Sequence, residues 1–215
     1  FDLRDNSGEN LNAALVATDY CVPSGLIAQS QDKGGNVTDL RMSDENEITL
    51  PMVCLVNGNT ASAAELFAAT LRTMNGARLV GTTTMGKGTI QSSPQRLSDG
   101  SAVVITVAKL VCGDGSCFDG TGLTVDVERA LSAEEATNFY DYTPQTDPQV
   151  QRAVSAAQQL SGTTTLAGAS SAAAADSAAS SAAAEDTAPA ETAEGEPAEG
   201  ETAASEPETA ASAAE

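Results

Sequence analysis

The 215-residue chain contains no histidine and no tryptophan, and only 3% of its residues are aromatic. A Ser-His-Asp triad therefore cannot form within it, and a nucleophilic serine would need a carboxylate or a lysine as its base. Lysine and arginine total 10 against 30 acidic residues, which gives a formal net charge of −20. Binding of nucleic acid or of an anionic lipid surface needs a basic footprint, so the composition argues against both.

Long apolar runs and metal-ligand patterns are also missing. No run of about 18 apolar residues occurs, so these residues are not expected to include a membrane span. A zinc site would need cysteine or histidine partners at suitable spacing, and no metal is expected. Cys54 lies in an apolar run and is interpreted as a small buried hydrophobe. Cys112 and Cys117 bracket a tight turn and form either a disulfide or two free thiols.

The acidity is unevenly distributed along the chain. Residues 161–215 hold 11 of the 30 acidic residues and no lysine or arginine, and Ala, Ser, Thr, Glu, Gly and Pro make up nearly all of them. Such a composition cannot bury enough apolar surface to offset the entropy of ordering. We therefore predict a single core domain over residues 1–160 and a disordered tail over residues 161–215. The chain begins at Phe1 inside an apparent strand, which suggests a fragment or a processed product.

Hydrophobic periodicity predicts an α/β core with a β-rich second half. The expected helices lie at residues 11–18, from 62 onward, and at 147–160, where Asp147 is the cap and Pro148 opens the first turn. The Gly34-Gly35 pair marks a hairpin between residues 25 and 42. Further strands are expected at residues 52–56, 77–81, 89–93, 101–111 and 123–128.

Ser62 stands where a strand and a short loop give way to a helix. Ser62-Ala63-Ala64-Glu65 fits the capping box S-x-x-E, which would make the serine a structural cap. A helix N-terminus also offers free backbone N–H groups and partial positive charge, which could stabilise the oxyanion of acyl transfer. The residues alone leave both interpretations open.

The candidate bases include only three lysines. Lys33 lies in a polar turn and Lys109 ends a strand, whereas Lys87 lies between two glycines after an apolar strand. A lysine acts as a base only where desolvation favours its neutral form, which the sequence permits at Lys87 but does not show. The alternative is a lysine at a flexible loop tip.

Residues 81–87, GTTTMGK, match the first seven positions of a phosphate-binding P-loop. The eighth residue is Gly88, so the hydroxyl that would bind magnesium is missing. The following residues are β-prone, and no helix N-terminus follows to bind phosphate. Nucleotide binding is therefore not expected.

Several segments together resemble the carboxy-terminal processing, or tail-specific, serine–lysine proteases. They are DLRDNSG, TASAAELFAATL, ARLVGTTTMGKGTIQ, LSDGSAVVITVAKL, GLTVDVE and DPQVQRAV, in the family's order over residues 1 to about 160. The resemblance implies a crotonase/ClpP-like core that is N-terminally truncated here. It also implies a PDZ domain upstream, outside these residues, that captures the substrate's C-terminus by strand addition.

The resemblance also implies residue roles. Ser62 would be the nucleophile, Lys87 the general base and Gln91 the residue that orients the lysine. The backbone amides of Gly8 and Ala63 would form the oxyanion hole. No cofactor or metal is implied. The family's Gly-Gly pair is Gly8-Glu9 here, its aromatic before Gly-Lys is Met85, and its late proline is Val125.

The implied function is a serine endopeptidase that cleaves polypeptides at unstructured or C-terminal segments through an acyl-enzyme. Its location would be extracytoplasmic, in the cell envelope or secreted, and a membrane anchor could come only from a missing N-terminal segment. No nucleic-acid or nucleotide partner is implied. The alternative is a non-catalytic binding or scaffold member of the same fold, which Glu9 and the truncated start leave open.

Overall fold

The computed structural model describes residues 1–162, so all but the start of the tail predicted from residue 161 lies outside the described residues. The helical elements are α1 (Leu11–Asp19), α2 (Ala63–Thr70), the π-helix η1 (Leu71–Asn75), α3 (Ala133–Thr137), the 3₁₀ helix η2 (Phe139–Asp141) and α4 (Pro148–Leu160). The strands are β1 (Gly25–Asp32), β2 (Val37–Ser43), β3 (Val53–Val56), β4 (Arg78–Gly81), β5 (Thr89–Gln91), β6 (Gln95–Arg96), β7 (Ala102–Val103), β8 (Thr106–Cys112) and β9 (Val127–Glu128).

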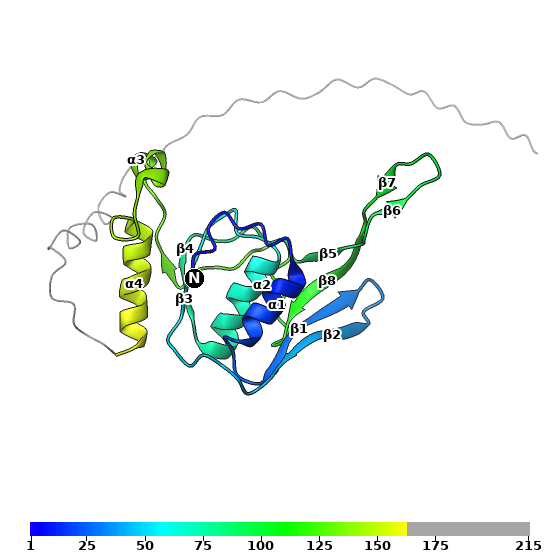
Figure 1. Cartoon of the computed structure of the whole chain (residues 1–215), viewed down its shortest axis with the longest axis horizontal. Coiled ribbons are helices and arrows are strands. Elements are labelled where there is room, and N and C mark those ends of the chain that lie inside the picture. The colour runs from blue at the N-terminus through cyan, green and yellow to red at the C-terminus, as the bar shows by residue number, and fades with distance from the viewer. Residues whose placement is uncertain (163–215) are drawn as a thin grey trace, which may run out of the picture. The chain divides into compact units, whose positions relative to one another are not determined.

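A parallel sheet in the order β3-β4-β9 lies between helices (Figure 1). Successive side chains of a strand point to opposite faces, and all four residues of β3 are buried. Cys54 and Val56 pack toward α2, whereas Val53 and Leu55 pack against α4. The uninterrupted apolar run at residues 52–56 is therefore the expected signature of a strand that is buried on both faces.

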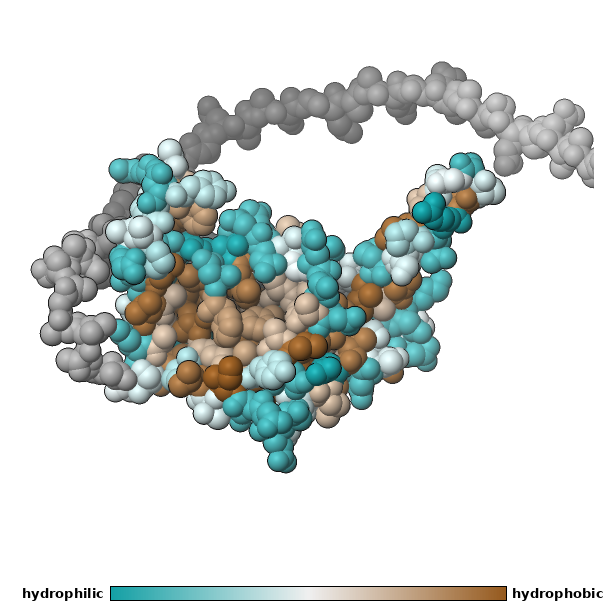
Figure 2. Space-filling view, viewed as in Figure 1, coloured by the Kyte–Doolittle hydropathy of each residue, from teal (hydrophilic) through white to brown (hydrophobic). Residues whose placement is uncertain are grey.

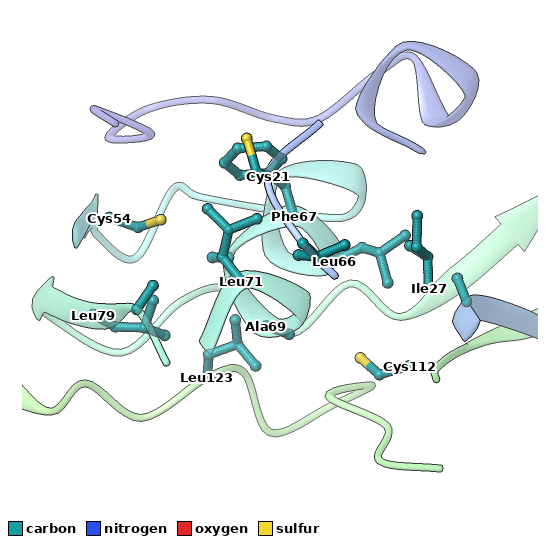
Figure 3. Close-up of a cluster of buried hydrophobic side chains, with 14 of the residues drawn as sticks. Cys21, Ile27, Cys54, Leu66, Phe67, Ala69, Leu71, Leu79, Cys112 and Leu123 are labelled. Carbon is teal, nitrogen blue, oxygen red and sulfur yellow. The ribbon is translucent and has the colours of Figure 1, made fainter. Parts of the chain in front are cut away.

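The main core lies around α2, where side chains from α2, η1, β3, β4 and β8 converge (Figure 3). Leu66, Leu71 and Leu79 are fully buried there. The structure has all four cysteines as free thiols, three buried and Cys117 exposed. Burial raises the pKa of the Cys54 thiol to about 12, as expected for a cysteine that acts as a small hydrophobe.

An antiparallel sheet in the order β2-β1-β8-β5 flanks this core, and the β6–β7 hairpin projects from it (Figure 1). The single strand expected at residues 101–111 is instead two strands, β7 and β8. Residues 104–105 belong to no strand, and within β8 the register shifts at Val107, opposite Ile90 and Gln91 of the paired strand. The Ser92 N–H donates to the Ile105 carbonyl at 2.8 Å, and the Ile105 N–H donates to the Ser92 hydroxyl oxygen at 3.2 Å. A local bulge of this kind disrupts the ladder and bends the strands.

The first residues of the chain are tied to β3 and to the start of α4. The Leu3 N–H donates to the Leu55 carbonyl at 2.8 Å. The Arg4 side chain is only 6% exposed and pairs with Asp2 at 2.6 Å and with Asp147 at 2.9 Å. Asp147 also caps α4, as its position in the sequence predicts. This network holds the segment around Gly8 beside the beginning of α2.

Candidate active site

Ser62 lies in a strained turn between β3 and α2. Its φ is 56° and its ψ is −118°, whereas an N-cap residue is usually extended. Such a conformation costs about 1–3 kcal/mol in a residue with a side chain and persists only where the surroundings fix it. A sharp strand-to-helix turn of this kind also presents the nucleophilic serine of α/β-hydrolases. The structure therefore places an unusual backbone conformation at the predicted nucleophile.

Hydrogen bonds from the N-terminal segment and the preceding loop hold this turn. The Asn57 N–H donates to the Thr60 hydroxyl at 2.9 Å, and that hydroxyl donates to the Leu3 carbonyl at 2.7 Å. The Ala61 N–H donates to the Asn6 carbonyl at 2.9 Å. Because these contacts fix the residues immediately before Ser62, they can maintain its strain.

The Glu65 side chain joins the serine turn to the lysine loop. It is fully buried, and its carboxylate accepts four hydrogen bonds. Oε2 accepts the N–H of Ser62 and the N–H of Lys87, both at 2.9 Å. Oε1 accepts the Gly86 N–H at 2.7 Å and the Thr84 hydroxyl. One carboxylate therefore fixes the backbone of both members of the predicted dyad.

The glutamate half of the expected capping box is thus present, since the Glu65 carboxylate accepts the Ser62 N–H. The sequence indicated Glu65 only as a local helix-capping residue. Its contacts with residues 84–87 depend on tertiary structure, and its burial is the signal that separates it from an ordinary surface cap.

The lysine loop is held from its other side by residues 118–122. Gly86 has a φ of 84°, and a Cβ there would lie 2.6 Å from the Gly122 nitrogen. The Gly120 N–H donates to the Gly86 carbonyl at 2.8 Å. The Gly88 N–H donates to Asp119 Oδ1 at 3.2 Å. Glycine is required at position 86 for close backbone approach, which supports the interpretation of the Gly-Lys-Gly motif as a packed loop.

The Lys87 side chain itself is exposed, and it has no hydrogen bond or ion pair within residues 1–162. Gln91, predicted to orient it, lies in β5 and bonds elsewhere. Its Nε2 donates to the Thr106 hydroxyl at 3.0 Å and to the Thr89 hydroxyl at 3.2 Å. The structure therefore brings together the backbones of the dyad but shows no contact between Gln91 and the lysine.

Gly8 and Ala63, the two predicted oxyanion donors, lie against each other. A Cβ on Gly8 would be 2.7 Å from the Ala63 nitrogen, and Gly8 has a φ of 67°, so only glycine fits. The Ala63 N–H opens α2 and has no acceptor within the described residues. The Gly8 N–H donates to Asn6 Oδ1 at 2.9 Å. In this arrangement the Ala63 N–H is free to donate to an oxyanion. An oxyanion would have to displace Asn6 Oδ1 to accept the Gly8 N–H.

Glu65 gives a test of this arrangement. We expect Glu65→Gln to lower the free energy of unfolding by about 2–4 kcal/mol, because the new amide group would leave buried N–H donors unpaired. Glu135 is a matched control, since it occupies the same position of the Ser132–Glu135 capping box but is partly exposed and pairs with Arg129. Glu135→Gln should cost no more than about 1 kcal/mol in urea unfolding. Equal costs for the two variants would contradict the linking role of Glu65.

Other kinds of site find little support within residues 1–162. No cluster of three or more histidine, cysteine, aspartate or glutamate side chains there could hold a metal ion. No described helix is both long and apolar enough to cross a membrane. The residues after Lys87 form β5 rather than a helix, so the P-loop-like segment lacks a helix N-terminus for phosphate.

Comparison with known proteins identifies the family of this chain. The sequence model of peptidase family S41 matches residues 1–129. Carboxy-terminal processing protease CtpA of Bacillus subtilis (strain 168) is 37% identical over 131 residues, which cover 60% of this chain and 28% of that protein. The carboxyl-terminal-processing protease of Synechocystis sp. (strain ATCC 27184 / PCC 6803 / Kazusa) is 34% identical over 155 residues, which cover 71% of this chain and 35% of that protein. The chain spans about a third of the length of these relatives.

Solved structures are also similar to this chain. The photosystem II D1 C-terminal processing protease is 34% identical with a TM-score of 0.55, over 60% of this chain and 33% of that one. A lipoprotein from Streptococcus agalactiae shares the fold alone, with 20% identity and a TM-score of 0.51 over 65% of this chain and 53% of that one. The predicted α/β fold class and the resemblance to C-terminal processing proteases are confirmed.

Proposed function

This chain belongs to peptidase family S41, and we propose on that basis that Ser62 and Lys87 form the catalytic dyad of a serine endopeptidase of the C-terminal processing type. The observation that carries the proposal is the strained Ser62 turn. Its serine lies at a helix start, beside the free N–H of Ala63, with its backbone linked through Glu65 to the lysine loop. A purely structural cap would not need a positive φ.

The dyad would work by proton transfer and acyl transfer. The neutral amine of Lys87 takes the proton of the Ser62 hydroxyl as its oxygen attacks the scissile carbonyl. The N–H groups of Ala63 and Gly8 stabilise the oxyanion, and Lys87 then protonates the leaving amine. Water hydrolyses the resulting ester and regenerates the serine.

Two features must change on passing from this structure to a reacting complex. Lys87 is exposed, and a lysine becomes a base only where it is shielded from water. Gly8 must also give up its bond to Asn6 for the oxyanion. We propose that the bound polypeptide covers Lys87 and that its carbonyl oxygen displaces the Asn6 side chain. Gln91 would orient the covered amine.

The names of the relatives support the substrate class. They are C-terminal processing proteases, and we propose polypeptides with unstructured or C-terminal segments as substrates. An extracytoplasmic location is proposed from the membership of this family. A non-catalytic binding or scaffold role is the second candidate, because the exposed Lys87 and the occupied Gly8 amide would suit a protein that does not cleave.

A serine-directed acylating probe separates the two candidates. A fluorophosphonate incubated with the full-length protein should label Ser62, detected by mass spectrometry of the digested protein. The exposed Ser93 serves as an internal control and should stay unlabelled. Labelling of Ser62 no faster than that of Ser93 would favour the scaffold role and overturn the protease proposal.

A further inference from the structure

A cavity of about 410 Å³ opens beside the candidate active site, between α1 and α2. Gly8 and Ala63, the proposed oxyanion donors, are part of its wall. Its volume falls within the range of about 300–1,000 Å³ that is typical of ligand pockets. The surface over α1 and α2 shows a largely apolar area (Figure 2). The apolar lining includes Ala13, Ala14, Ala17, Cys21, Ala64 and Phe67.

This cavity lies where a substrate side chain must go. An acyl group on Ser62, with its oxygen held by Gly8 and Ala63, carries its side chain on the Cα atom next to the acyl carbon. The cavity shares those two residues with the proposed oxyanion hole. We infer that the cavity receives the side chain of the residue that precedes the scissile bond, that this side chain is apolar, and that Glu9 disfavours an acidic one. This inference rests on the proposed function.

The inner walls of the cavity favour an apolar side chain. Ala13 and Ala17 lie one turn apart on α1 and leave space through their small side chains. Cys21 and Phe67 are buried deeper, and Phe67 packs edge to face on Phe1 with ring centroids 5.0 Å apart. These walls hold no cationic side chain that could pair with an acidic one. Burying an unpaired charge there would be costly, so only an apolar group gains from entering.

Glu9 supplies the only charged side chain that lines the cavity. Two other polar residues line it, but the side chain of Asn6 accepts the Gly8 N–H, and that of Asn10 accepts the Ala13 N–H. The Glu9 carboxylate is exposed and has no ion pair within residues 1–162. It is therefore free to repel an acidic substrate residue and to attract a basic one near the mouth of the cavity.

The apolar pocket is tested by filling it. Ala17 is exposed on α1, so Ala17→Phe adds a ring at the cavity without entering the core. Peptides that differ only in the residue before the scissile bond are compared by kcat/KM with the full-length protein. Ala17→Phe should lower kcat/KM for a leucine peptide at least tenfold, and for an alanine peptide less than threefold. Ala133→Phe, on the exposed α3, is the matched control and should change neither value.

The role of Glu9 is tested with the same peptides. Glu9→Gln should raise the kcat/KM of an aspartate peptide about threefold to tenfold relative to that of a leucine peptide. In the unaltered protein kcat/KM should be higher for the lysine peptide than for the aspartate peptide. Glu9→Lys should reverse this order. Glu45→Gln, another exposed glutamate, should have no effect on either peptide.

Acyl labelling of Ser62 separates failure of the pocket from failure of the catalytic proposal. Normal labelling, with a leucine-to-alanine ratio unchanged by Ala17→Phe, would overturn the pocket alone. An aspartate-to-leucine ratio unchanged by Glu9→Gln would overturn the role of Glu9. Absence of labelling in the unaltered protein would overturn the protease assignment and the pocket with it.

Discussion

Ser62→Ala and Ser62→Gly should both abolish peptide cleavage, with kcat/KM falling at least about 10⁴-fold, because neither side chain carries a nucleophilic oxygen. Their stabilities should differ. Alanine keeps a Cβ in the backbone conformation with φ 56° and ψ −118°, whereas glycine adopts it without steric cost. We therefore expect Ser62→Gly to raise the free energy of unfolding by about 1 kcal/mol over the unaltered protein, and Ser62→Ala to leave it nearly unchanged.

The measurements are peptide hydrolysis and urea unfolding of the same full-length variants. Greater stability in an inactive Ser62→Gly variant would show that the strain at Ser62 serves activity rather than folding. Substantial cleavage by either variant would exclude Ser62 as the nucleophile. Lower stability of Ser62→Gly than of Ser62→Ala would show that the turn is not strained.

Most of the fold was predictable because its signals are local or depend on simple patterns. The apolar run at residues 52–56 marks a strand buried on both faces, and Asp147 followed by Pro148 marks the start of α4. The predictions were less accurate where pairing decides the structure. Residues 101–111 divide into β7, which pairs with β6, and β8, which pairs with β1 and β5, and strand propensity does not reveal these partners.

The candidate site was predictable in its residue types but not in its connections. The absence of histidine and the Gly-Lys-Gly motif direct attention to Lys87. That Glu65 holds both Ser62 and Lys87 could not be predicted, because its hydrogen bonds cross 22 positions of sequence. The exposure of Lys87 and the bond from Gly8 to Asn6 also depend on tertiary contacts rather than on motif spacing.

The buried Glu65 explains how the backbones of Ser62 and Lys87 keep a fixed position relative to each other. Its two oxygens accept N–H groups from both segments, so a displacement of one segment would leave a buried carboxylate without its donors. Loss of charged hydrogen bonds in the interior is costly. The backbone of the proposed dyad is thereby fixed before substrate binds, whereas the lysine side chain has still to be covered and the Gly8 N–H released from Asn6.

Lys87→Arg tests whether the lysine acts as a base or only as a positive charge. A guanidinium keeps the charge but stays protonated in proteins, so it cannot accept the Ser62 proton. We expect kcat/KM for peptide cleavage to fall at least about 10³-fold in Lys87→Arg, and equally in Lys87→Met. The unfolding free energy should change little, because Glu65 holds residue 87 through its backbone N–H.

Lys33→Arg is the matched control, since Lys33 is an exposed lysine in the turn between β1 and β2. Lys33→Arg should leave kcat/KM for peptide cleavage within about twofold of that of the unaltered protein, as expected for a solvated side chain that does not contact the reacting atoms. Retention of activity by Lys87→Arg, with loss in Lys87→Met, would indicate that the charge rather than proton transfer is needed. Some other group would then have to take the proton of Ser62.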